Sequence, residues 1–252
     1  MRNGERTTVT SVDRALQLLL HLRNGPLTVK AASEQLAVAP STAYRLLSTL
    51  TARGFAEQAG DRRYGPGPEL VLRAADQLSL DDLRRRAHPA LRQLHADVDD
   101  TVQLMVLSGA SIQFIDGIES SAVLRVAPRV GAFMPAYCSA GGKAILAALA
   151  WSEVERCYPA GLTPWESAKL RSMEELADEL ARTRSARYGM NHDETEAGVT
   201  GVGVSITGPA GGPVAAFTVA IPSARFHRRN LSHYVRSLTV AAQTASEALV
   251  DL

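Results

Sequence analysis

Residues 27–55 read LTVKAASEQLAVAPSTAYRLLSTLTARGF, and this stretch determines how the rest of the chain is interpreted. It contains two short helical patterns with a tight break between them. Thr28 is a suitable N-cap for the first pattern, and the preceding Leu27 suits a hydrophobic staple. Pro40 fits the first position of the second helix, where its missing N–H costs nothing. Gly54 can adopt the positive φ that ends a helix.

The second helix of this stretch combines an apolar face with a polar start. Its apolar residues recur at helical spacing and predict a buried stripe, which comprises Ala43, Leu46, Leu47 and Leu50. The polar residues of its first turns lie off this stripe and are Ser41, Thr42, Tyr44 and Arg45. A helix-turn-helix recognition helix has this layout, with the first turns directed at base edges. Thr28 and Lys30 are further candidates for DNA contact. The alternative is an αα-hairpin whose polar residues only face water.

A third helical pattern precedes the stretch. Ser11 is expected to cap it, and its buried face is expected to comprise Val12, Ala15, Leu16, Leu19 and Leu20. Asn24-Gly25-Pro26 ends it. Three short helices of this kind form a minimal helix-turn-helix core. Residues 1–10 are polar and are expected to form a flexible arm.

A basic hairpin is predicted directly after Gly54. The run from Phe55 to Tyr64 contains a Gly-bearing turn at residues 59–61 and then Arg62 and Arg63. Arg-Arg on a turn is usually solvated surface. Next to a recognition helix it is interpreted here as a wing that contacts the DNA backbone or minor groove.

Charge and composition separate the chain into two parts. Residues 1–66 carry nine Lys or Arg and five Asp or Glu, whereas the rest carries 18 basic and 21 acidic residues. A basic head on a mildly acidic body is typical of a phosphate-binding module joined to a second function. The two cysteines, Cys138 and Cys157, provide neither a disulfide framework nor zinc spacing. We find no signal peptide and no long apolar run, so a cytoplasmic protein without a membrane partner is expected.

The ordered motifs of the chain resemble the IclR family of bacterial transcription regulators. The resemblance rests on the stretch 27–55 together with SVDRALQLLLHL, RRYGPGPELVLRAA, LRRRAHPALRQLHADVDDTVQLMVL, GGKAILAAL, ETEAGVTGVGVSI and PVAAFTVAIP. It covers nearly the whole chain. The family usually has Gly at the position of Ala37 in the turn, so this turn must form without that residue's conformational freedom.

The predicted fold is α+β with a winged helix-turn-helix at residues 1–67, a linker helix at 68–80 and a second domain at 81–252. Gly65-Pro66-Gly67-Pro68 marks the boundary. Pro89 predicts a kink or restart in the helix that follows Ser79. Strands are expected at 101–107, 112–118, 122–126, 199–206 and 214–221, and helices at 140–148, 172–184 and 231–249. The resemblance implies that this antiparallel sheet belongs to a GAF-like effector-binding domain.

Several patterns in the second domain could suggest an enzyme, and each is rejected. Gly201-Val202-Gly203 lacks the third Gly of a dinucleotide fingerprint and lies within a strand. Lys143 lacks phosphate-loop spacing, and Cys138 is expected to be a buried structural thiol. His192-Asp193-Glu194 are adjacent loop residues that point in different directions, so no metal is expected there. No cofactor is expected either.

The resemblance implies a small-molecule pocket between residues 134–142 and the two late strands. The family's pair of amides that holds an acidic effector matches Ala140 and Gly141, at the start of a helix that favours anions. The polar positions of the family fall at Gly201, Thr218, Ala220 and Asn191, so three polar groups are lost or altered. A roomier, more apolar pocket is therefore expected, with Met134 and Tyr137 as lining candidates and an aromatic or branched acid as effector.

These observations predict a DNA-binding regulator that senses a small organic acid, with repression favoured over activation by family analogy. Its expected partners are a double-stranded DNA operator, the effector and a second copy of itself, as a dimer or a dimer of dimers. Two alternatives remain. One is a ligand-converting enzyme with an appended nucleic-acid-binding module, and the other is a nucleoid-type binder with no ligand response.

Overall fold

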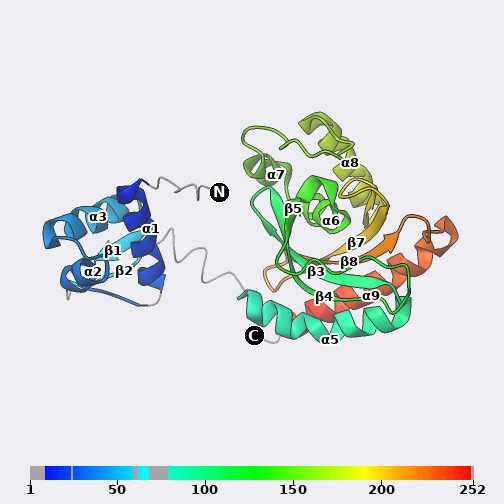
Figure 1. The fold of residues 1–252 in the computed structure, drawn as a ribbon, viewed down its shortest axis with the longest axis horizontal. Coiled ribbons are helices and arrows are strands. Elements are labelled where there is room, and N and C mark those ends of the chain that lie inside the picture. The colour runs from blue at the N-terminus through cyan, green and yellow to red at the C-terminus, as the bar shows by residue number, and fades with distance from the viewer. Residues whose placement is uncertain (1–8, 24, 59–61, 68–78, 251–252) are drawn as a thin grey trace, which may run out of the picture. The chain divides into compact units, whose positions relative to one another are not determined.

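The computed structural model describes residues 9–23, 25–58, 62–67 and 79–250. The chain forms two compact units, Met1–Leu78 and Ser79–Leu252 (Figure 1). Residues 68–78 of the predicted linker helix at 68–80 lie outside the described residues, whereas Ser79 and Leu80 cap and begin the next helix.

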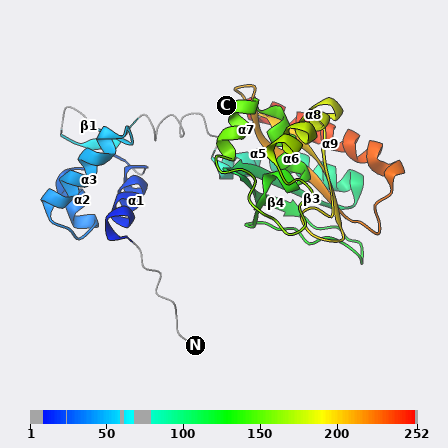
Figure 2. The same cartoon turned by 90° about the horizontal axis from the view of Figure 1, so that it is seen from above.

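The first unit is a winged helix-turn-helix. Its helices are α1 (Thr10–Arg23), α2 (Val29–Gln35) and α3 (Pro40–Ala52). Strands β1 (Ala56–Gln58) and β2 (Tyr64–Pro66) pair in antiparallel fashion, and Leu27 forms an isolated bridge to Tyr64. Figure 2 shows the three helices gathered around one small core, to which Leu18, Leu47 and Tyr64 contribute buried side chains.

Local signals set the boundaries of the two central helices as predicted. The Thr28 hydroxyl accepts a hydrogen bond from the Ala31 amide at 3.1 Å and caps α2. Pro40 is the first residue of α3, and Gly54 ends that helix with φ +76°. In the turn, Ala37 adopts φ +49°, a left-handed conformation that costs a residue with a Cβ atom roughly 1–2 kcal/mol.

Helix α1 buries a different face from the predicted one. It begins at Thr10 rather than after Ser11. Leu18 and Leu22 are fully buried, whereas Val12, Leu16 and Leu20 are each more than half exposed. The helix carries two apolar stripes, and its packing against the rest of the unit selects the stripe of Leu18 and Leu22.

The second unit is built on a six-stranded antiparallel sheet with the order β5-β4-β3-β8-β7-β6. The strands are β3 (Thr101–Ser108), β4 (Ser111–Ile118), β5 (Phe133–Pro135), β6 (Gly189–His192), β7 (Val199–Thr207) and β8 (Pro213–Pro222). Chain neighbours pair as hairpins on both sides, and the central β3–β8 pair joins the two halves.

Helices cover both faces of this sheet (Figure 1). Helices α5 (Leu80–Val98) and α9 (Leu231–Val250) lie together on one face. On the other face lie α6 (Ala140–Ala148), α7 (Trp151–Cys157) and α8 (Met173–Ala186). The fold is therefore α+β, as predicted. Helix α5 continues through Pro89 without a restart.

One prediction about the second unit was wrong. Residues 122–126 do not form a strand: Val123 is almost fully exposed, and side-chain bonds hold the segment in place of a ladder. The Thr101 hydroxyl donates to the Val126 carbonyl, and the Ala122 amide donates to the Ser120 hydroxyl. The third strand of the meander is β5 instead. Helix α7 and strand β6 were not predicted.

Candidate functional site

The predicted recognition surface is a single exposed face of α3. Ser41, Tyr44 and Arg45 are exposed and Thr42 is half-buried, while Ala43, Leu47 and Leu50 are buried beneath them. An apolar face holds the helix against the core, so its polar face is presented rigidly to solvent. This arrangement fits insertion of the first turns into a DNA major groove.

The remaining DNA candidates flank this surface in the chain. The Thr28 hydroxyl already accepts the hydrogen bond that caps α2. Lys30 forms an exposed ion pair with Glu34 at 3.9 Å. Arg62 and Arg63 are both exposed at the start of β2. Arg62 has φ +63°, so the backbone turns sharply before the strand.

In the second unit, glycines bring the start of α6 into close contact with the sheet. A Cβ on Gly203 would lie 2.7 Å from the Gly141 amide nitrogen, and a Cβ on Gly189 would lie 2.1 Å from the Ala140 carbonyl oxygen. Side chains at either position would push the helix away from the strands. The Gly201-Val202-Gly203 run thus serves helix packing.

The first amides of α6 have no acceptor inside the helix. The Ser139 hydroxyl caps α6 by accepting from the Gly142 amide at 2.9 Å. The amides of Ala140 and Gly141 precede that bond and carry the positive end of the helix dipole. A helix start of this kind favours an anion.

A small cavity of about 20 Å³ lies beside this helix start, and we call it the inner cavity. Five of the residues proposed for the effector pocket line it, namely Ala140, Asn191, Gly201, Thr218 and Ala220, whereas Gly141 does not. A space of this size holds roughly one water-sized group. The inner cavity is therefore much narrower than the loss of polar residues suggested.

Thr218 is the most informative residue of the inner cavity. It is 4% exposed, and its hydroxyl is buried without a hydrogen-bond partner among the described residues. A buried hydroxyl left in this way costs about 1–3 kcal/mol. Asn191 differs, because its amide group donates to Thr195 at 3.0 Å and accepts from the Gly201 amide at 2.9 Å.

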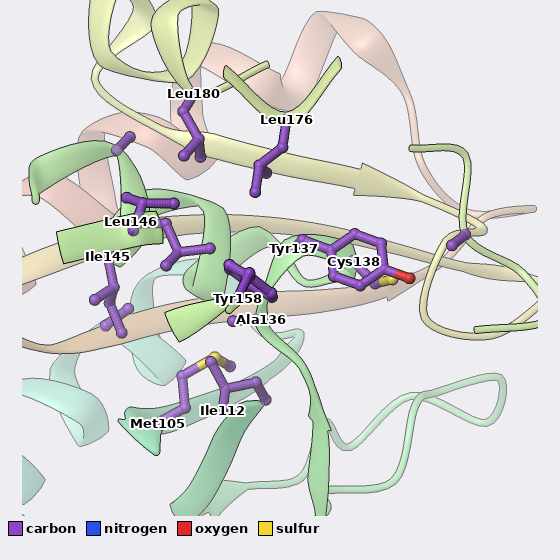
Figure 3. Packing of buried hydrophobic residues seen from close by; sticks show 14 of the residues in the cluster. Met105, Ile112, Ala136, Tyr137, Cys138, Ile145, Leu146, Tyr158, Leu176 and Leu180 are labelled. Carbon is purple, nitrogen blue, oxygen red and sulfur yellow. The ribbon is translucent and has the colours of Figure 1, made fainter. Parts of the chain in front are cut away.

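Met134 and Tyr137 do not line the inner cavity, so these two assignments were wrong. The Tyr137 ring packs edge-on against Tyr158 in the core beneath α6 (Figure 3). Its hydroxyl donates to the Thr163 carbonyl at 2.7 Å, and burial raises its pKa to about 12. Met134 packs at the edge of the same core. Both residues support the segment that leads into α6.

Lys143 is a structural residue that sequence reasoning did not identify. Its side chain is 2% exposed, and its ammonium donates to Glu194, Glu179 and the Met190 carbonyl at 2.8, 3.1 and 3.0 Å. Burial raises the pKa of Glu179, but Lys143 and Arg182 outweigh that effect and hold it below its usual value. Lys143 therefore fixes α6 to α8 and to the loop after β6.

A second, open pocket of about 400 Å³ lies next to the inner cavity, and we call it the outer pocket. Arg129 and Val199 line both spaces. The Arg129 guanidinium forms an ion pair with Glu196, which also lines the outer pocket. Sequence reasoning missed Arg129 because it lies in a loop without regular periodicity.

The groups that could suggest an enzyme are separated or inert. Burial raises the pKa of the Cys138 thiol to about 11, so it is not a thiolate at neutral pH. His192 contacts Thr200, Asp193 contacts Ser223, and Glu194 contacts Lys143. Within the described part of the chain, no group of three or more metal-ligating side chains occurs.

Comparisons with known proteins agree with both units. Residues 11–60 match the IclR helix-turn-helix domain, and residues 75–247 match the bacterial transcriptional regulator IclR C-terminal domain. The HTH-type transcriptional regulator Rv1719 of Mycobacterium tuberculosis is 32% identical over 221 residues, which cover 86% of this chain and 84% of that protein. The acetate operon repressor of Salmonella typhimurium is 30% identical over 223 residues, covering 86% and 81%.

A solved structure shares the fold. The crystal structure of the Thermotoga maritima IclR matches with a TM-score of 0.63 and 25% sequence identity. The match covers 96% of this chain and 100% of that chain. In the residues that the structure describes, no helix is long and apolar enough to cross a membrane. The matched relatives are regulators rather than enzymes. The chain therefore belongs to the IclR family and is a DNA-binding transcriptional regulator.

Proposed function

We propose that this regulator is an operator-binding repressor whose second domain binds a small organic acid. Residues 1–67 are assigned to DNA binding, residues 68–80 to the linker and residues 81–252 to effector binding and self-association. The similarity to a protein named as the acetate operon repressor supports repression. The effector assignment is supported by the chemistry of the inner cavity.

The unpartnered Thr218 hydroxyl carries the effector proposal. Thr218 packs against Gly141 through its methyl group, because a Cβ on that glycine would be 2.8 Å from the methyl carbon, and the residue also lines the inner cavity. A carboxylate oxygen in the inner cavity would accept from this hydroxyl and from the Ala140 amide, since both residues line that space. Two donors that converge on one oxygen at a helix start favour the ionised acid.

We further propose that the chain acts as a dimer or a dimer of dimers. One recognition helix reads only a few base pairs, so paired half-sites require paired copies. The exposed apolar stripe of α1, formed by Val12, Leu16 and Leu20, supports this proposal. Contiguous apolar side chains of this kind are typical of contact surfaces.

Arg45 and Arg62 are expected to contribute to DNA binding in different ways. Arg45→Ala should weaken binding to a selected operator by about 1–3 kcal/mol and relax base preference at one position, because it removes a base contact. Arg62→Ala should weaken binding to all sequences and flatten the dependence of affinity on salt, because it removes a phosphate contact.

The measurement uses an operator selected from random duplexes with the purified full chain, followed by titrations at several salt concentrations. Arg92→Ala, an exposed change on α5 in the second unit, is the matched control and should leave both readouts unchanged. Wild-type affinity and base preference in Arg45→Ala would show that α3 does not enter the groove as proposed.

A further inference from the structure

The inner cavity contains one charged side chain, and it is a cation. Among the described residues that line the inner cavity, Arg129 is the only one with a charged side chain, and none of them is an Asp or Glu. Asn191, where the family resemblance expects an acid, is neutral. Together with the helix start, the inner cavity is positive on two sides.

Arg129 is anchored at the boundary between the two spaces. Its backbone amide donates to the Gln103 side-chain carbonyl at 2.9 Å. Gln103 lies directly opposite Thr218 in the β3–β8 register, so the loop that carries Arg129 is tied to the strand position next to the unpartnered hydroxyl. The anchor fixes the backbone and leaves the guanidinium able to change partners.

The ion pair between the Arg129 guanidinium and Glu196 is weak. The Arg129 side chain is 18% exposed, whereas that of Glu196 is 60% exposed. Ion pairs with such an exposed member contribute little to stability. The guanidinium also contacts the Met134 sulfur at 3.9 Å, and a thioether sulfur is a weak acceptor. A guanidinium has five N–H donors, so most of its capacity remains for a ligand.

We propose that Arg129 is a second anion-binding group and that the effector is an acid with two anionic groups. This inference rests on the proposed function. One carboxylate oxygen enters the inner cavity, which holds roughly one water-sized group. The ligand body extends into the outer pocket, and its second carboxylate replaces Glu196 on Arg129. Specificity for a diacid over a monoacid then comes from one side chain.

Calorimetric titration of the full chain with matched acids tests this proposal. The pairs are butyrate and succinate, pentanoate and glutarate, hexanoate and adipate, and benzoate and terephthalate. At least one diacid should bind about tenfold or more tightly than its partner, as expected for an added charge-assisted contact. Arg129→Gln should reduce that ratio to about one, and Glu196→Gln should raise the diacid affinity.

Arg125→Gln is the matched control. Arg125 lines the outer pocket but not the inner cavity, and it pairs with Glu119 at 2.6 Å. This variant loses the same charge and should keep the diacid preference. Equal binding of every pair, a preference that survives Arg129→Gln, or a preference lost in Arg125→Gln would each overturn the inference. Monoacid binding that requires Thr218 would still leave the proposed function intact, whereas no binding by any acid would overturn both.

Discussion

Replacing Lys143 by methionine is expected to lower the free energy of unfolding of the second unit by about 3–5 kcal/mol. The substitution removes an ammonium with three oxygen partners and leaves Glu194, which is 7% exposed, buried without a counter-charge. Methionine has a similar length, so the loss reports the charge and its hydrogen bonds rather than a cavity. Urea unfolding followed by circular dichroism measures it.

Two further variants separate this effect from a general charge effect. Arg182→Met removes another partner of Glu179, at 2.9 Å, but Arg182 is 66% exposed, so the expected cost is below about 1 kcal/mol. Adding Glu194→Gln to Lys143→Met should restore part of the stability, because it neutralises the uncompensated carboxylate. A loss in Lys143→Met no larger than that in Arg182→Met would mean that the buried ammonium does not hold α6 in place.

Thr218→Val is expected to change stability and acid binding in opposite directions. Removing a buried hydroxyl that has no partner should leave the free energy of unfolding unchanged or raise it. The same change should weaken binding of the tightest acid by roughly 10–100-fold, because a carboxylate loses one charge-assisted donor. Urea unfolding and calorimetry on the same preparation give both numbers.

Thr101→Val is the matched control for this prediction. Thr101 is also fully buried on the sheet, but its hydroxyl donates to the Val126 carbonyl and accepts from the Ser120 amide. Its replacement should cost about 1–3 kcal/mol of stability and leave acid affinity within a factor of about two. If Thr218→Val destabilised the protein and bound acid like wild type, Thr218 would be a structural residue only.

Local signals in the sequence predicted much of the fold. Thr28 and Pro40 set the starts of α2 and α3 through capping and N1 chemistry, which depend only on neighbouring residues. Helix α6 has its predicted bounds. The face of α1 was wrong because the helix has two apolar stripes, and periodicity alone does not say which one meets α3 and β2.

The site depends on long-range contacts that no local pattern encodes. Lys143 meets Glu179 and Glu194, which lie 36 and 51 residues further along the chain. Residues 122–126 look like a strand, but the hydroxyl of Thr101, 25 residues before Val126, holds them in another conformation. Tyr137 lies within the segment 134–142 that was expected to border the pocket, yet its hydroxyl donates to the Thr163 carbonyl and its ring lies in the core.

We expect acid binding in the second unit to alter operator binding by the first. The most direct measurement is operator affinity of the full chain with and without a saturating concentration of the tightest acid, paired with acid affinity with and without operator. We expect the acid to change operator affinity by about 5–150-fold and the operator to change acid affinity by the same factor, since linkage is reciprocal. An acid that binds through Thr218 and leaves operator affinity unchanged would contradict the account.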